Sequence, residues 1–181
     1  NLSVEVVPVI RPNACIGALA LLRRCNDGEV RQNELRGQLL HKGYYAKYSF
    51  DDVIGQSAAI RRTKETLTRM ANSESPILLI GETGTGKELF AHAVHRASRR
   101  AAGPFLALNV AAFPENLLES ELFGYEEGAV TGAKKGGRPG LFALAHRGTP
   151  FLAAVAGLRT ALQLQLLRTL RDREAMRLAG N

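Results

Sequence analysis

Cysteine is scarce in this sequence, and long apolar runs are absent from it. The two cysteines, Cys15 and Cys25, match no spacing typical of a metal site or a redox pair. The longest apolar run near the N-terminus, Ala14–Leu22, contains a glycine and is far shorter than the roughly 20 residues that a membrane-spanning helix needs. The sequence also lacks a basic start followed by a long apolar region and a small-residue cleavage site. These absences argue against a transmembrane segment and a signal peptide, and they predict a reduced, cytoplasmic setting.

The composition is that of a globular protein with an excess of basic residues near its end. Hydrophobic residues make up 45% and charged residues 23% of 181 residues, enough for one core and part of a second. Residues 1–133 contain 15 basic and 15 acidic residues, whereas residues 134–181 contain 9 basic and 2 acidic residues. A basic segment can indicate a nucleic-acid surface. Here no aromatic residues are interleaved with the basic ones, and the arginines are spaced as on a solvated helix face, which argues against direct nucleic-acid binding.

The N-terminal part has the pattern of a hairpin followed by a helix. Two apolar runs, residues 2–10 and 15–24, flank a turn that contains Pro12, and they predict an antiparallel hairpin. A helix is then expected to begin at Asp27 and to end near Gly43. We therefore divide the chain into a hairpin over residues 1–26, a linker helix over residues 27–47 and a further domain over residues 48–181.

From residue 48 onward, predicted strands and helices alternate. The predicted strands are 77–80, 105–109 and 149–155, and the predicted helices are 58–71, 87–98, 115–123 and 158–178. Alternation of this kind is typical of an α/β fold in which helices cover both faces of a parallel sheet. Pro150 lacks the N–H group that a sheet ladder uses, and it predicts a distorted third strand.

A phosphate-binding motif lies between the first predicted strand and the next helix. Residues 81–87 read G-E-T-G-T-G-K and fit the pattern G-x-x-x-x-G-K, in which backbone N–H groups face a pyrophosphate and the lysine reaches the terminal phosphates. The N-terminus of the following helix adds its partial positive charge. A glycine turn with an unrelated lysine is the alternative. Glu88 stands where Ser or Thr would donate a hydroxyl to Mg²⁺, and this weakens a metal site.

Four stretches in this order identify a family. They are F-D-D-V-I-G-Q-S, G-E-T-G-T-G-K-E-L-F-A, L-L-E-S-E-L-F-G-Y-E-E-G-A-V-T-G-A and L-L-R-T-L-R-D-R-E. With them the chain resembles, over about residues 47–181, the central ATPase domain of sigma-54-dependent transcriptional activators. The resemblance implies a P-loop AAA+ fold in three layers, ATP-driven remodelling of sigma-54 RNA polymerase, and hexameric rings.

The same resemblance implies how the rest of the chain is organised. Residues 1–26 would be the last hairpin of a PAS-type sensor domain, with unrelated β structure as the alternative. The C-terminal side of the AAA+ domain and the DNA-binding domain of the family lie beyond Asn181, so we expect a partial AAA+ domain that meets DNA only through a domain outside this chain.

The resemblance also assigns roles to individual residues. Ile54 and Gly55 would lie near the adenine, and Asn109 matches the polar switch residue of the family. The ATP phosphates would be bound by Gly81, Glu82, Thr83, Gly84, Thr85, Gly86, Lys87 and Glu88, because the family's loop regularly ends in Lys-Glu. The loop that contacts sigma-54 would comprise Gly128, Ala129, Val130, Thr131, Gly132 and Ala133. Valine replaces the phenylalanine of the family's G-A-F-T-G-A element and offers less contact area, so we expect weakened contact with sigma-54, with an unpartnered surface loop as the alternative.

The acids of the family's catalytic strand are missing. That strand reads approximately G-T-L-F-L-D-E-I-G-E in the family, where the aspartate helps to hold Mg²⁺ and the glutamate orients the attacking water. Here the two positions are Ala153 and Ala154, and Ala143 and Gly157 likewise replace family glutamates. We therefore assign no catalytic residue and no metal ligand. The sequence predicts a chain that binds ATP, with Mg²⁺ held weakly through the nucleotide, and that hydrolyses it poorly.

Three alternatives stay open. The chain could be a working ATPase that recruits another acid, such as Glu88. It could be a degenerate subunit that joins rings of intact homologues or binds sigma-54 without remodelling it. It could also be a decayed fragment without a role. His92 and His95 lie at i, i+3 without partner acids or cysteines, which argues against a zinc site.

Overall fold

The computed structural model divides into two compact units, residues 1–38 and 39–181. The residues that it describes are 2–11, 14–24, 27–125 and 137–172. Among them, no helix combines the length and the apolar character needed to cross a lipid bilayer.

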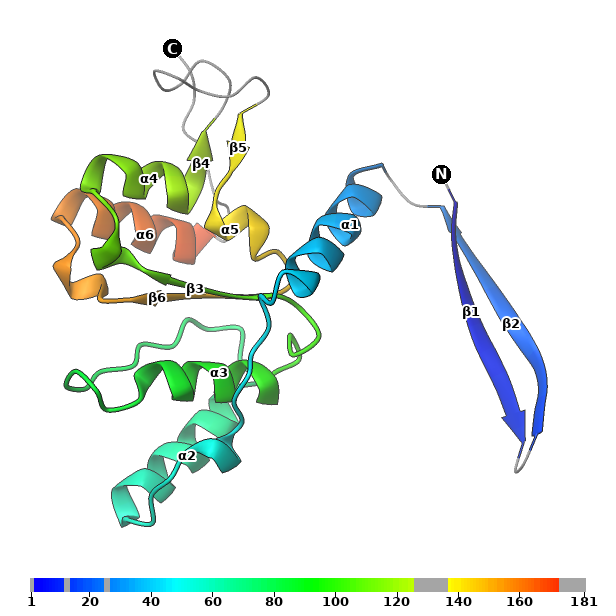
Figure 1. The fold of residues 1–181 in the computed structure, drawn as a ribbon, viewed down its shortest axis with the longest axis horizontal. Coiled ribbons are helices and arrows are strands. Elements are labelled where there is room, and N and C mark those ends of the chain that lie inside the picture. The colour runs from blue at the N-terminus through cyan, green and yellow to red at the C-terminus, as the bar shows by residue number, and fades with distance from the viewer. Residues whose placement is uncertain (1, 12–13, 25–26, 126–136, 173–181) are drawn as a thin grey trace. The chain divides into compact units, whose positions relative to one another are not determined.

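The first unit contains the hairpin that the sequence predicts (Figure 1). β1 (Leu2–Arg11) and β2 (Ala14–Arg24) pair in antiparallel orientation, and the register shifts between Val9 and Ile10. Such a shift is typical of a β-bulge, which increases the local twist. The expected hairpin is therefore present, whereas its origin in a PAS-type sensor stays a prediction.

The helix after the hairpin, α1 (Asp27–His41), begins at the expected residue and ends just before Gly43, as expected, while residues 42–47 of the expected linker are not helical. Gly43 adopts a φ of +87°, its N–H donates to the Leu40 carbonyl at 3.1 Å, and the Tyr44 N–H donates to the Leu39 carbonyl at 3.1 Å. This pair of bonds is a Schellman cap, which requires a left-handed residue just after the helix. The linker helix therefore ends at His41.

A parallel pair of strands lies at the centre of the second unit, between two layers of helices (Figure 1). The strands are β3 (Phe105–Asn109) and β6 (Thr149–Ala153). One face carries α4 (Glu115–Phe123), α5 (Leu141–Leu144) and α6 (Thr160–Asp172), and the other faces α2 (Ala58–Met70) and α3 (Lys87–Ala97). The shorter elements are the 3-10 helices η1 (Phe50–Asp52), η2 (Val110–Ala112) and η3 (Val155–Gly157), and an antiparallel pair, β4 (Gly124–Tyr125) and β5 (Arg138–Pro139). This three-layer arrangement agrees with the predicted α/β class.

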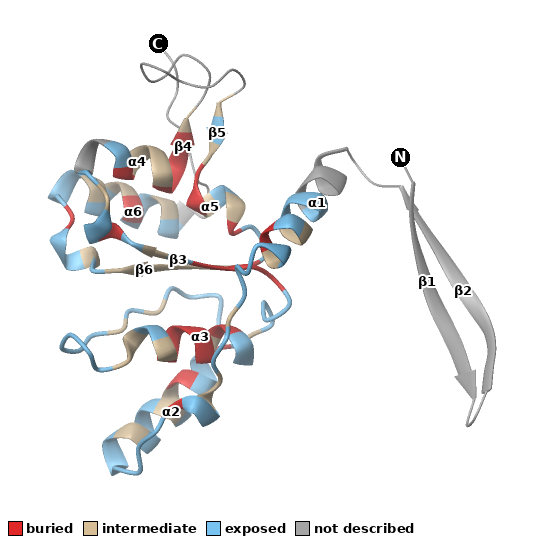
Figure 2. Cartoon of the chain, in the orientation of Figure 1, coloured by how far each residue is buried: buried red, intermediate tan, exposed pale blue. Residues whose placement is uncertain are grey.

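Buried residues lie on both sides of the strands (Figure 2) and form two apolar clusters. The larger one lies between the strands and the helices α4, α5 and α6, and it includes the fully buried Leu122 and Phe123. The smaller one joins Val53, Leu67 and Phe90, and so ties the segment before α2 to both α2 and α3. The elements around the phosphate-binding motif therefore share one core.

The prediction of a strand over residues 77–80 is wrong, because these residues adopt no regular secondary structure. Ile77 and Leu79 pack against the smaller cluster, while Leu78 and Ile80 remain 72% and 88% exposed. This alternation is the period-2 pattern of a strand. Within the described part of the chain no strand pairs with this segment, so it forms no ladder.

The expected distortion at Pro150 is also wrong. β6 runs without interruption through Pro150, which is the register partner of Leu106 on β3. The Thr149 N–H donates to the Pro104 carbonyl at 2.9 Å, so the next residue turns its nitrogen away from β3. Proline is tolerated at such an edge because no N–H is required there.

Candidate functional site

The motif of residues 81–87 forms a loop that leads into α3. Gly84 and Gly86 adopt φ values of +85° and +80°, which glycine reaches without the cost that a Cβ would bring. Gly86 caps α3 without any side-chain hydrogen bond. The first N–H groups of a helix have no partner within the helix, so this end presents free donors and a partial positive charge to an anion.

Lys87 folds back over the loop. Its Nζ donates to the Gly81 carbonyl at 2.8 Å and to the Glu82 carbonyl at 2.6 Å. The Thr85 hydroxyl donates to the same Glu82 carbonyl at 2.8 Å. A Cβ on Gly81 would lie 2.9 Å from Thr85 Oγ1, so the turn is compact at its start. The ammonium group is therefore held beside the backbone that would surround a phosphate.

The two residues expected near the adenine lie between η1 and α2. Val53 belongs to the smaller cluster with Phe90 of α3, while Ile54 is 96% exposed. Gly55 has a φ of +153°, and a Cβ there would lie 3.1 Å from the Ile60 side chain. The shared core thus fixes the segment before α2 against α3, which follows the loop. The exposed Ile54 side chain is accessible to a ligand.

The expected switch residue and the expected acid positions lie at the ends of β3 and β6. Asn109 and Ala153 are register partners, and Asn109 Oδ1 accepts a hydrogen bond from the Ala111 N–H at 3.1 Å. Ala154 follows in a left-handed conformation, with φ of 62° and ψ of 30°. The strand ends carry an amide and two methyl groups, so this position offers no carboxylate to a metal or to water.

The described residues around the loop and the strand ends do not form a site for a protein-held Mg²⁺. In the described part of the chain, no three His, Cys, Asp or Glu side chains gather in a way that could hold a metal ion. Glu88 is 67% exposed, and its Oε1 lies 3.9 Å from His92 Nε2. With alanine at 153 and glutamate at 88, Mg²⁺ would depend on ligands from a nucleotide.

The two histidines of α3 serve the packing of the unit. His95 shares a hydrogen bond of 2.8 Å with Thr149 Oγ1, and His92 Nδ1 accepts the Lys47 N–H at 3.2 Å. Burial lowers the pKa of both imidazoles, opposed at His92 by the Glu88 carboxylate and at His95 by the Gly103 carbonyl. These contacts support a structural role for both histidines.

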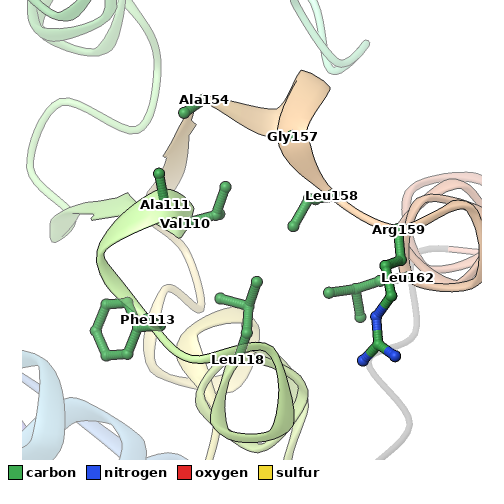
Figure 3. Close-up of a pocket in the computed structure, with 9 residues that line it drawn as sticks. All are labelled: Val110, Ala111, Phe113, Leu118, Ala154, Gly157, Leu158, Arg159 and Leu162. Atoms are coloured by element: carbon green, nitrogen blue, oxygen red, sulfur yellow. The ribbon is translucent and has the colours of Figure 1, made fainter.

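A small cavity lies beside the end of β6 (Figure 3). Its volume is about 210 Å³, and side chains from η2, α4 and α6 converge on it. Its lining residues are Val110, Ala111, Phe113, Leu118, Ala154, Gly157, Leu158, Arg159 and Leu162. Two of the positions where the family pattern has glutamate, 154 and 157, therefore lie on the wall of this cavity.

Sequence reasoning missed one ion pair, between α4 and β5. Arg138 donates to Glu121 Oε1 at 2.6 Å and to Oε2 at 3.1 Å. Opposite charges on the two sides of a glycine-rich loop were the signal that could have suggested it. The residues of the expected sigma-54 contact loop, Gly128–Ala133, lie outside the described residues.

Comparisons with known proteins identify the family of the chain. Residues 53–181 match the protein family described as the Sigma-54 interaction domain. The chain is 45% identical over 166 residues to a Nif-specific regulatory protein of Herbaspirillum seropedicae, covering 92% of this chain and 30% of that protein. It is 40% identical over 175 residues to the transcriptional activator RocR of Bacillus subtilis, covering 96% of this chain and 36% of that protein. It is also 52% identical over 136 residues to a signal-transduction and transcriptional-control protein of Clostridium beijerinckii, covering 75% of this chain and 22% of that protein.

Solved structures of NtrX from Brucella abortus are similar as well. In complex with ATP, NtrX superposes with a TM-score of 0.60 at 35% identity, over 70% of this chain and 26% of NtrX. In complex with ADP, the TM-score is 0.62 at 34% identity, over 73% of this chain and 28% of NtrX. The chain spans well under half the length of all these relatives. The family match and the relatives show that this chain belongs to the Sigma-54 interaction domain family of sigma-54-dependent transcriptional activators, with its AAA+ α/β fold.

Proposed function

We propose that this chain is a nucleotide-binding sigma-54 interaction module that binds ATP and hydrolyses it poorly. One observation carries the proposal: the loop keeps its glycines and its folded-back Lys87, while the end of β6 has Ala153 and Ala154. Binding and hydrolysis depend on different groups, so one can persist without the other.

Phosphate binding would use the loop from Gly81 to Glu88. The free N–H groups at the start of α3 would meet the phosphate oxygens, and Lys87 would exchange its carbonyl contacts for the terminal phosphates. Ile54 and Gly55 would contact the adenine from the segment before α2. The complexes of NtrX with ATP and with ADP support this proposal.

Hydrolysis would fail at the end of β6. In-line attack on the γ-phosphate needs a carboxylate or similar group to orient the attacking water. The methyl group of Ala154 cannot orient water. Asn109, which would switch that carboxylate in the family, instead caps η2. We expect a loss of several orders of magnitude in turnover, as is typical when such a group is removed.

Nucleotide affinity tests the proposal directly. A fluorescent ATP analogue should bind the unmodified chain, and Lys87→Ala should weaken binding by about 10-fold to 100-fold, because a charge-assisted hydrogen bond contributes about 1.5–3 kcal/mol. Lys42→Ala is the matched control, since Lys42 is exposed just after α1. Steady-state phosphate release should stay at background. If the unmodified chain does not bind nucleotide, the proposal is contradicted.

Partners follow from the same proposal. The chain would contact sigma-54 through Gly128–Ala133 and would join a ring of its own copies or of homologous subunits. Co-purification with sigma-54, and light scattering with and without ATP, test these two interactions separately. If the chain stays monomeric and does not co-purify with sigma-54, with or without ATP, both proposed interactions are contradicted.

A working ATPase is the second candidate, because Glu88 directly follows Lys87 and is exposed. If the chain is a working ATPase, it should release phosphate above background, and this release should depend on the Glu88 carboxylate. Turnover that falls in Glu88→Gln but not in Glu82→Gln would favour it over the first proposal.

A further inference from the structure

Three segments meet where β3 and β6 begin, at the end of the sheet opposite to Asn109 and Ala153 (Figure 1). They are residues 42–48 after α1, residues 96–100 at the end of α3, and residues 146–148 before β6. We call the surface that they form the basic edge. The hydrogen bonds that hold it together run from the Phe105 N–H to the Tyr44 carbonyl at 3.0 Å, from Arg96 Nη1 to the Lys47 carbonyl at 3.2 Å, and from Arg100 Nη1 to the Gly148 carbonyl at 3.3 Å.

The charges of the basic edge have one sign. The sequence contains no acidic residue over 35–50, 89–114 or 128–171, the ranges to which the three segments belong. Asp52, whose carboxylate accepts the Ser49 N–H at 2.6 Å, lies close enough to Arg96 for the two charges to interact. Among the described residues, no carboxylate forms an ion pair with the other cations of the basic edge. Such an excess attracts a polyanion. The exposed cationic side chains are Lys42, Lys47, Arg96, Arg99, Arg100 and Arg147.

Arg147 keeps its place in an unfavourable backbone conformation. Its φ is +57°, in the left-handed region that disfavours a residue with a Cβ and that glycine adopts readily. Its carbonyl is packed so closely that a Cβ on Gly103 would overlap it. The Arg147 side chain is exposed, so burial in the core does not compensate for this strain. Strain at an exposed arginine points to a use for its charge.

Three exposed tyrosines are interleaved with the lysines of residues 42–48. The stretch reads K-G-Y-Y-A-K-Y, and Tyr44, Tyr45 and Tyr48 are 43%, 50% and 44% exposed. The Tyr48 ring packs edge-on against His92, with ring centroids 5.3 Å apart, and this contact holds it at the surface. Aromatic rings beside cations are typical of surfaces that bind single strands, because the rings stack on unpaired bases while the cations contact phosphates. An acidic protein segment would use the cations alone.

We infer that the basic edge binds single-stranded nucleic acid, with its lysines and arginines on the phosphates and its tyrosines on the bases. This site goes beyond the proposed function and is separate from the nucleotide site. A helix rises about 1.5 Å per residue, so the eleven residues of α3 place the basic edge about 16 Å from the phosphate-binding loop. The inference departs from the expectation that this chain meets DNA only through another domain. The basic segment 134–181 did not indicate it, because the cations come from three separate parts of the sequence.

Salt-dependent binding of a labelled oligothymidylate, followed by fluorescence anisotropy, tests the phosphate contacts. The logarithm of the affinity should fall linearly with the logarithm of the salt concentration, with a slope of about −0.7 per phosphate contact. Lys42→Gln with Arg99→Gln should weaken binding at least tenfold and make the slope shallower by about 1.4, because two contacts are lost. Arg61→Gln with Arg62→Gln is the matched control, which removes two exposed arginines from α2 and should change binding less than twofold. Equal losses in the two double variants would overturn the inference.

Two further variants separate binding from folding and bases from phosphates. Arg147→Gly should raise Tm, because glycine relieves the left-handed strain, and should still weaken binding at least threefold. Tyr45→Ala should weaken binding of the oligothymidylate at least threefold without changing the salt slope, and should leave binding of a duplex unchanged. ATP affinity should stay the same in all these variants. If a duplex or poly-glutamate binds as tightly as the oligothymidylate at the same salt concentration, the basic edge is not a single-strand site and the inference is wrong.

Discussion

Asn109 and Ala153 face each other as the last register partners of β3 and β6. The strand expected to carry the family's acids therefore pairs with β3 as far as the expected switch residue, and Pro150 does not interrupt the pairing. A carboxylate at position 153 would therefore lie at the strand end beside Asn109. A chain in this state should regain metal-dependent behaviour when the carboxylates are returned.

Ala153→Asp is expected to make ATP binding depend on Mg²⁺. A carboxylate at the end of β6 would add a protein oxygen to an ion otherwise held by phosphates. We expect ATP affinity about tenfold higher with Mg²⁺ than with EDTA, a difference of about 1.4 kcal/mol, against a smaller ratio in the unmodified chain. Titrations of the fluorescent analogue in both buffers measure it. Equal ratios in the two chains would contradict the expectation.

Adding Ala154→Glu to Ala153→Asp is expected to raise phosphate release above background. The glutamate would return the group that orients water, and Asn109 already lies at the neighbouring strand end. Phosphate release under saturating Mg²⁺-ATP provides the measurement. Lys87→Ala in the same background should abolish any gain, and turnover that survives Lys87→Ala would point to a contaminating ATPase.

Ala154→Gly should stabilise the second unit. Ala154 has a φ of 62°, and the left-handed region costs a residue with a Cβ about 1 kcal/mol. Removing that cost should raise Tm by about 2–4 °C for a domain of this size. Ala156→Gly in η3 is the control and should lower Tm slightly, because its φ is not positive. A lower Tm for Ala154→Gly would mean that the Ala154 methyl group has a packing role.

Much of the second unit was predictable because its strands and helices alternate. β3 and α4 have the predicted bounds, 105–109 and 115–123. The conformation of residues 77–80 could not be predicted, because alternating apolar residues indicate which face of a segment is buried but not whether a strand pairs with it. Pro150 was misjudged for a related reason, since its effect depends on which edge its nitrogen faces.

Only the local part of the site could be predicted from sequence. The glycines and Lys87 carry a local pattern, so the loop could be located from sequence. The ion pair of Glu121 and Arg138 joins residues from α4 and β5, and only the pairing of β4 with β5 brings them together. Charge alone does not specify such a contact.

Acidification should destabilise the second unit through His92 and His95. Burial lowers the pKa of both below the usual 6.5, so the unfolded chain binds protons more readily than the folded one. Their contribution to stability is complete above pH 6.5 and is lost as pH falls from 6.5 toward the folded values, by at most about 1.4 kcal/mol per pH unit for each group. The urea midpoint should therefore fall between pH 7 and pH 5.

Two variants identify the source of that pH dependence. His95→Gln removes one of the two buried titrating groups and should flatten the decline in the urea midpoint, whereas His146→Gln changes an exposed histidine and should leave the decline unchanged. Midpoints that do not vary from pH 8 to pH 5 would show that the histidines are not linked to folding.

Gly140→Ala should destabilise the unit by about 2 kcal/mol or more, as overpacking in a tight site typically does. Its φ is −83°, which any residue adopts, so the cost comes from space alone. The new Cβ would overlap the Gly124 nitrogen and the Leu122 carbonyl, both of them backbone atoms that cannot turn aside. Gly157→Ala is the matched control, because a Cβ there has no neighbour within 4 Å, and its urea midpoint should stay close to that of the unmodified chain. If both variants unfold at the same urea concentration, the backbone at β4 and β5 can separate to admit a methyl group, and the close contact between Gly124 and Gly140 is not required for the fold.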